Sequence, residues 1–119
     1  MDSLTHYRQT IQTCLQHYYA LSQNQPRSRH SNAEITDHLI LDAERDRYLW
    51  LRCGWEDKKR VQHIILYLRI ENGKIWVETD NTDLGIVDDL LAAHIPQQDI
   101  VLGFHHPSKR PLTEFAVGV

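Results

Sequence analysis

The histidines are the first residues of this sequence that could do chemistry. There are eight of them, and zinc sites use three or four His, Cys or carboxylate ligands at recognisable spacings. Only His105 and His106 cluster, and adjacent side chains of an extended segment point apart. Cys14 and Cys53 lack CxxC spacing and are too few for a disulfide framework. We therefore predict no metal site, no cofactor, and two reduced, buried thiols.

Acidic residues form the second candidate for chemistry. Glu78 and Asp80 share one face of an expected strand, and Asp83, Asp88 and Asp89 follow. General acid–base catalysis needs a carboxyl group whose surroundings shift its pKa into the working range. This stretch is polar and lies near a turn, so we expect solvated or helix-capping acids. The sequence also lacks the nucleophile-elbow, P-loop and dinucleotide-binding motifs, and we predict that the protein is not an enzyme.

Three short basic groups are candidates for contact with nucleic acid. Phosphate binding needs such charges gathered on one surface. Here they fall in separate loops of a chain whose net charge is −3. Direct DNA binding is therefore the alternative hypothesis and not the favoured one. The residues that would carry it are Arg27, Arg29, Lys58, Lys59 and Arg60.

The composition is that of an ordinary globular protein. Hydrophobic residues make up 41% and charged residues 24% of 119 residues, a length that fits one domain. The first ten residues, MDSLTHYRQT, lack the basic head and apolar run of a signal peptide. No apolar stretch approaches the roughly 18 residues of a membrane span. We predict a single cytoplasmic domain over residues 1–119 that makes no membrane contact.

Two stretches have the periodicity of helices. Apolar residues recur at three- and four-residue steps over residues 4–21, which predicts a long N-terminal helix ending before Pro26. Residues 86–91 place their apolar side chains on one side of a shorter second helix. Asn81 or Thr82 is the expected cap of that helix. Residues 100–104 then read as a short buried strand or extended segment, followed by a tail whose apolar end docks on the body.

The strongest strand signal is the pair Asn72-Gly73. These residue types tolerate the positive φ angles of a two-residue type I′ turn, so they fix the register of a hairpin. The register puts an aliphatic face on one side of the hairpin and a polar and aromatic face on the other. The predicted pairs are Leu68 with Val77, Arg69 with Trp76, Ile70 with Ile75, and Tyr67 with Glu78.

A second hairpin is expected one strand earlier, around a four-residue turn at residues 56–59. It pairs Leu51 with Ile64 and Leu49 with Leu66, which adds Leu49 and Leu51 to the aliphatic face. A further strand over residues 35–41 precedes it. A three-residue loop would face Leu39 and Leu41 inward and a four-residue loop would face Ile40 inward, and we favour the former.

Together these elements predict an α+β fold. It consists of an antiparallel four-stranded meander, a long N-terminal helix on its aliphatic face, a short second helix and an extended C-terminal tail. The opposite face of the sheet is then rich in the residue types that are enriched at protein interfaces. Its coverage by the chain's own tail and its use as an interface are equally favoured, and both can hold. The candidate interaction residues are Tyr48, Trp50, Tyr67, Arg69 and Trp76.

Roughly two-thirds of the chain also resembles a known family. The stretches that carry the resemblance are DAERDRYLWLRCGW at residues 42–55, LYLRIENGKIWVETD at residues 66–80, NTDLGIVDDLLAAHIPQQDIVLGF at residues 81–104, and the ending RPLTEFAVGV. They are similar to the fdxN element excision controlling factor family, the XisI-like proteins. The resemblance is specific because of the order of its motifs, which are GW, NGKIWVE-D, the Gly-Ile helix, IP--DIVLGF and the FAV ending.

The resemblance implies a role as well as a fold. Such proteins, of cyanobacterial type, are accessory factors needed alongside a site-specific recombinase for excision of a DNA element, and the resemblance supplies no catalytic residues to carry over. The resemblance further implies a protein partner, either the nuclease-like XisH-type factor or the recombinase complex. We also predict a homodimer, because an aromatic sheet face or the open edge of the first strand is otherwise exposed.

Overall fold

The structure is a computed structural model that describes residues 3–24 and 33–118 of the chain. Its elements, in chain order, are the helix α1 (Ser3–Asn24), the strands β1 (Ala33–Asp42), β2 (Arg47–Glu56), β3 (Lys59–Glu71) and β4 (Lys74–Asp80), the helix α2 (Ile86–Ala92), the 3-10 turn η1 (Gln97–Asp99), the strand β5 (Ile100–Leu102) and the 3-10 helix η2 (Pro107–Leu112). The expected α+β class is confirmed.

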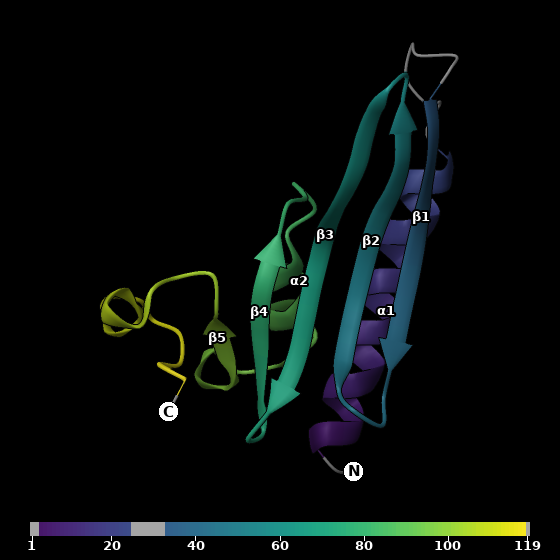
Figure 1. The fold of residues 1–119 in the computed structure, drawn as a ribbon. Coiled ribbons are helices and arrows are strands. Elements are labelled where there is room, and N and C mark those ends of the chain that lie inside the picture. Colours follow the sequence, from purple (N-terminus) through teal and green to yellow (C-terminus); the bar gives the residue numbers. More distant parts are fainter. Residues whose placement is uncertain (1–2, 25–32, 119) are drawn as a thin grey trace.

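The strands form one mixed sheet in the order β1-β2-β3-β4-β5 (Figure 1). The first four strands are antiparallel neighbours, as predicted. β5 adds a fifth strand parallel to β4, so the expectation of a strictly four-stranded antiparallel sheet was wrong. The reason is that α2 lies between β4 and β5 and returns the chain to the starting end of β4, which is the connection a parallel pair requires.

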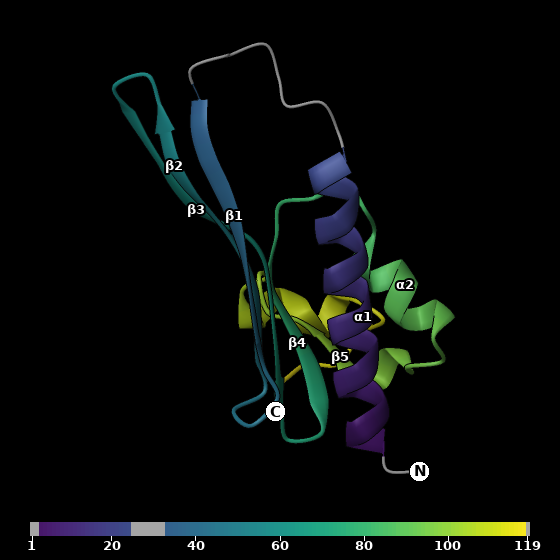
Figure 2. The same cartoon turned by 90° about the vertical axis from the view of Figure 1, so that its right-hand side faces the viewer.

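Both helices lie on one side of the sheet, which we call the inner face (Figure 2). α1 turns Tyr7, Ile11, Leu15 and Tyr18 into the core, each at most 5% exposed. These positions follow the three- and four-residue spacing of the sequence, so the predicted helix and its apolar side are confirmed. The other side of β1, β2 and β3, which we call the outer face, has no helix of the described residues packed on it (Figure 2).

α2 begins differently from expectation. Its N-cap is Gly85 in the left-handed conformation, with no side-chain cap. Thr82 belongs instead to the preceding turn, where it donates to Asp80 and accepts from the N–H of Leu84. The expected cap at Asn81 or Thr82 was therefore wrong by three or four residues. The helix still buries Ile86 and Leu90 against the core, as predicted.

The hairpin at Asn72-Gly73 has the predicted register near its turn. Arg69 pairs with Trp76, Ile70 with Ile75, and Leu68 with Val77. Asn72 and Gly73 both have positive φ, as a type I′ turn demands. Farther from the turn Tyr67 pairs with Thr79 and not with Glu78, because Glu78 is an extra residue at a bulge in β4.

A second bulge changes which side chains of β2 enter the core. Leu51 pairs with Ile64 as predicted, but Trp50 pairs with Leu66, so Ile65 is the extra residue in β3. Beyond the bulge every side chain of β2 is shifted by one place relative to β3. Tyr48 and Trp50 therefore face α1, at 0% and 3% exposure, and Leu49 faces outward. The prediction that Tyr48 and Trp50 share a face with Tyr67 was wrong.

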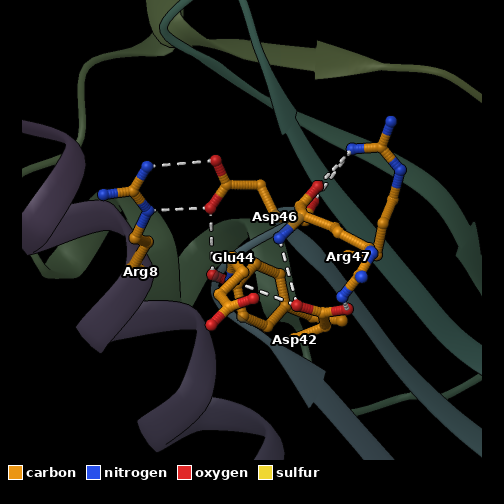
Figure 3. Close-up of polar contacts among 7 residues, drawn as sticks. Arg8, Asp42, Glu44, Asp46 and Arg47 are labelled. Carbon is orange, nitrogen blue, oxygen red and sulfur yellow. Dashed lines mark hydrogen bonds and ion pairs between the residues drawn. The ribbon is translucent and has the colours of Figure 1, made fainter.

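The same shift explains the loop between β1 and β2. Asp42 pairs with Arg47, which leaves a four-residue turn where a three-residue loop was expected. Leu39 and Leu41 nevertheless face inward and contact the core, because they pair with Trp50 and Tyr48. The turn is tied to α1 by Arg8, whose guanidinium group bonds the Asp46 carboxylate at 2.7 and 3.1 Å (Figure 3).

Candidate interaction surface

The outer face carries a contiguous apolar patch, which we call the outer patch. The strand register places its members side by side in two rows that cross β1, β2 and β3. Ile40 is 44% exposed and the others are half-buried. An apolar group with polar neighbours on a sheet face is the usual composition of a protein-binding surface. The outer patch consists of Ile40, Leu49 and Tyr67 in one row, and Leu51 and Ile64 in the next.

Polar residues border the outer patch at both ends. Arg47 and Arg69 pair with each other across β2 and β3 at one end, and Cys53 pairs with Gln62 beyond the other end. Arg69 is held in place, since it forms an ion pair with Glu71 and its guanidinium carbon lies 4.2 Å from the centroid of the Trp76 ring. A charged rim fixed in this way favours one orientation of a bound protein.

Trp76 is on the outer face but is covered by the C-terminal tail. Arg110 of η2 lies over the indole ring at 5.2 Å from its centroid, on the same ring that Arg69 contacts. Gly118 also approaches so closely that a Cβ atom there would lie 2.6 Å from the ring. Beside it, Ala116 donates its N–H to the Ile100 carbonyl at 2.9 Å. The tail therefore covers β4 and β5, and leaves the outer patch on β1–β3 open.

The predicted interaction residues are thus divided between three environments. Tyr67 is part of the outer patch, Arg69 is in its rim, and Trp76 lies beneath the tail. Tyr48 and Trp50 are in the core against α1. Sequence reasoning missed Leu49, Leu51 and Ile64 as surface residues, because both alternations along β2 are apolar and only a bulge decides which of them faces outward. The favoured register placed Ile40 outward correctly, but Ile40 was not named as an interaction residue.

The acidic residues make hydrogen bonds or close charge contacts with neighbouring side chains, which give them structural roles. Asp80 accepts hydrogen bonds from the N–H and hydroxyl groups of Thr82, and Glu78 lies 3.8 Å from Arg69. Asp89 accepts from the Tyr18 hydroxyl and Asp99 from that of Tyr7, which joins α1 to α2 and η1. Burial and the bond to Asp99 raise the pKa of Tyr7 to about 12. Structural roles therefore account for these carboxylates.

The described residues 3–24 and 33–118 contain no group of three or more His, Cys, Asp or Glu side chains placed to hold a metal ion. His105 packs on Phe104 at 4.6 Å between ring centroids, and His106 accepts from the Ser108 N–H through Nδ1. Cys14 and Cys53 are free and half-buried. A shallow groove of about 360 Å³ lies between α1 and α2, lined by His6, Cys14 and Asp89 among others.

The basic residues of the alternative hypothesis do not form one described surface. Lys58, Lys59 and Arg60 are exposed at the turn that joins β2 and β3. Glu56 and Asp57 share that turn, so the apex carries both signs of charge. Arg60 is turned toward Trp55, at 5.2 Å from its ring centroid. The remaining two residues, Arg27 and Arg29, lie outside the described residues.

Fold and surface together define a small α+β protein with one helix-covered sheet face and one open apolar face. A comparison with protein families matches residues 1–117 to the family described as "XisI protein". The chain belongs to the XisI family, and the resemblance seen in its sequence is confirmed. None of the helices in the described part of the chain is long and apolar enough to cross a membrane.

Two solved structures from Anabaena variabilis ATCC 29413 are similar over nearly the whole chain. One is the fdxN element excision controlling factor XisI, which is 62% identical, has a TM-score of 0.86, and matches over 98% of this chain and 100% of that chain. The other is a XisI-like protein, 30% identical with a TM-score of 0.82, matching over 97% and 99%. None of the curated proteins searched matches this chain.

Proposed function

We propose that this protein is a non-enzymatic accessory factor in the control of excision of a DNA element, and that it acts by binding another protein. The support is family membership together with 62% identity to a protein named as an fdxN element excision controlling factor. The sites in the described residues that could do chemistry have structural explanations, whereas the outer patch has none.

The outer patch is the surface that we assign to the partner protein. Of five apolar side chains on adjacent strands, Ile40 is exposed and the other four are half-buried, and α1 already supplies the core that the inner face needs. Aliphatic and tyrosine side chains at the centre with arginine at the rim match the composition of interface centres and rims. The single observation that carries the proposal is that the C-terminal tail covers Trp76 but leaves Leu49, Leu51 and Tyr67 uncovered.

The partner that we propose is the nuclease-like XisH-type factor or the recombinase complex. A stable complex of two proteins buries roughly 800 Å² on each side, so a bound protein would extend past the outer patch. Arg47 at one end is positioned to meet an acidic group of the partner, whereas Arg69 is already paired with Glu71.

The proposal is tested in the host that carries the excised element. The gene is deleted and replaced by wild type, by Leu51→Arg in the outer patch, or by Leu112→Arg in η2. Leu112 is 85% exposed, so this control adds the same charge without touching the core. We expect Leu51→Arg to lose excision at normal protein levels, and Leu112→Arg to retain it. Excision that persists without the gene would refute the function, whereas excision supported equally by both variants would refute only the surface.

A further inference from the structure

We propose that β1 is a self-association edge, and that two copies of this chain pair antiparallel through residues His38–Asp42 about a two-fold axis at Ile40. This inference concerns the open edge of the sheet, which shares only Ile40 with the outer patch, and it does not depend on the role in excision. Its partner is a second copy of the same chain. The continuous sheet formed would contain both outer patches on one side.

The first support is that β1 has an open edge at residues 38–42. It pairs with β2 over ten residues and is the end strand of the sheet order, and no strand among the described residues lies on its other side. A long unpaired edge presents backbone N–H and C=O groups to any further strand. In Figure 1 β1 runs along one side of the molecule, away from the C-terminal tail.

The second support is the direction of the backbone groups along β1. The Thr36 hydroxyl donates to the Cys53 carbonyl at 3.3 Å, so that carbonyl points toward β1 opposite Thr36. In an antiparallel ladder, hydrogen-bonded and non-hydrogen-bonded pairs alternate. Leu39 and Leu41, an odd number of residues from Thr36, therefore direct their N–H and C=O groups toward the open edge.

The third support is that the sequence of this edge is complementary to itself. Residues whose backbone N–H and C=O groups point to the open edge must lie opposite residues of the same kind in the second copy. This requirement allows only registers that put the two inner faces on the same side of the joined sheet. With the axis at Ile40, Leu39 exchanges backbone hydrogen bonds with Leu41 of the second copy, and Ile40 meets Ile40. His38 then lies opposite Asp42 at both ends. With the axis at His38, Glu34 would instead oppose Asp42, a repulsive pair of acids.

The side chains in this register are suitably exposed. Ile40 is 44% exposed on the outer face, where non-hydrogen-bonded pairs bring side chains closest. The Asp42 carboxylate accepts from the N–H groups of Glu44 and Arg45 and from the Arg45 side chain, which leaves about one of its roughly four acceptor positions for His38. The bonds from Arg45 also hold the pKa of Asp42 below its usual value, so that the group is charged at neutral pH.

The pairing is short because the next residue along β1 limits it. Asp37 carries its side chain on the inner face, where it is 3% exposed and bonded to Arg52 at 2.8 Å. An inward-facing charge next to an edge segment restricts further strand addition. Five paired residues bury less surface than a typical stable interface. We therefore expect association at about micromolar concentrations or above, rather than a permanent dimer.

Matched substitutions at position 38 test the register. His38→Lys places a positive group opposite Asp42, and His38→Glu places an acid there, at the same exposed site. Sedimentation equilibrium over about 1–200 μM is expected to give a dimer for wild type and for His38→Lys, and a dissociation constant roughly tenfold weaker for His38→Glu. A strict monomer over this range, or equal dissociation constants for the two variants, would overturn the proposal.

Cysteine cross-linking tests the position of the axis independently. Ile40→Cys places two thiols across the axis with Cα atoms about 4.5 Å apart, which is within disulfide range. Thr36→Cys lies on the same face of β1 but far from the axis. Both variants carry Cys53→Ser, because Thr36 pairs with Cys53 across β1 and β2 and a thiol there could close an intrachain disulfide. We expect a rapid disulfide-linked dimer from Ile40→Cys and none from Thr36→Cys. A dimer that forms equally from both, or from neither, means that copies associate through another surface or not at all.

Discussion

Trp50 lies directly opposite Leu66 across β2 and β3, although its position counted from the turn at residues 57–58 places it opposite Ile65. The single extra residue at Ile65 turns Trp50 into the core beneath α1 and leaves Leu49 and Leu51 on the outer face. The whole location of the outer patch therefore depends on this bulge. Replacing the two indole rings of β2 separately tests it.

Trp50→Ala is expected to destabilise the fold by about 3–5 kcal/mol, because it removes a large side chain that is 3% exposed. Trp55→Ala in the same strand removes an identical side chain that is 47% exposed, together with its contact to Arg60. That change is expected to cost about 1 kcal/mol or less. Urea unfolding, analysed with one m-value for both variants, measures the two changes in the free energy of unfolding. Equal costs for the two variants would contradict the bulge.

The partly buried ion pair between Asp37 and Arg52 predicts a dependence of stability on pH. Burial alone would raise the pKa of Asp37, but the hydrogen bonds and charge of Arg52 lower it below its usual value. The carboxylate therefore stabilises the fold above an unfolded-state pKa of about 3.9, and this contribution is lost as the pH falls through the lower folded-state value.

We expect Asp37→Asn to lose about 1–3 kcal/mol at pH 7, where a charged hydrogen bond is removed. The difference in the free energy of unfolding between wild type and Asp37→Asn should shrink as the pH is lowered from about 5 to about 2. Asp83→Asn, at an exposed site, is the control and should change little. A difference that stays constant over this range would show that Asp37 does not carry the effect.

The chain alone is not expected to bind duplex DNA. Lys58, Lys59 and Arg60 share their turn with Glu56 and Asp57, and the net charge of the chain is −3. Electrophoretic mobility shift at about 50 mM salt, where phosphate contacts are strong, measures this directly. Binding that falls steeply with added salt and is lost when Lys58, Lys59 and Arg60 are changed to Ala would instead support the DNA-binding alternative. Arg27→Ala with Arg29→Ala separates the contribution of the other basic group.

The sequence was sufficient to predict elements that depend on local chemistry. Residues 4–21 show a helical stripe, and Asn72-Gly73 fixes a turn and the four pairs next to it. It was not sufficient for features decided by packing over a distance. Nothing local marks Ile65 or Glu78 as extra residues, since each fits an unbroken strand equally well. β5 is only three residues long, and only its position beside β4 makes it a strand.

The predicted interaction residues divide in the same way between those decided by local chemistry and those decided by packing over a distance. Tyr67 and Arg69 were placed on the correct face, because they lie on β3 between the Asn72-Gly73 turn and the bulge at Ile65, where β3 alternates without an extra residue. Tyr48 and Trp50 are beyond the bulge and were placed on the wrong face. The covering of Trp76 by Arg110 and Gly118 depends on where the tail returns, which spacing along the sequence does not determine.

The affinity of the purified XisH-type factor for the outer patch tests the central claim most directly. Isothermal titration would compare wild type with Leu51→Arg and Leu112→Arg, each first shown by circular dichroism to be folded. A charge placed at the centre of a protein interface is expected to weaken binding at least about tenfold, or about 1.4 kcal/mol. The account predicts this loss for Leu51→Arg and none for Leu112→Arg. Unchanged binding by folded Leu51→Arg would contradict it.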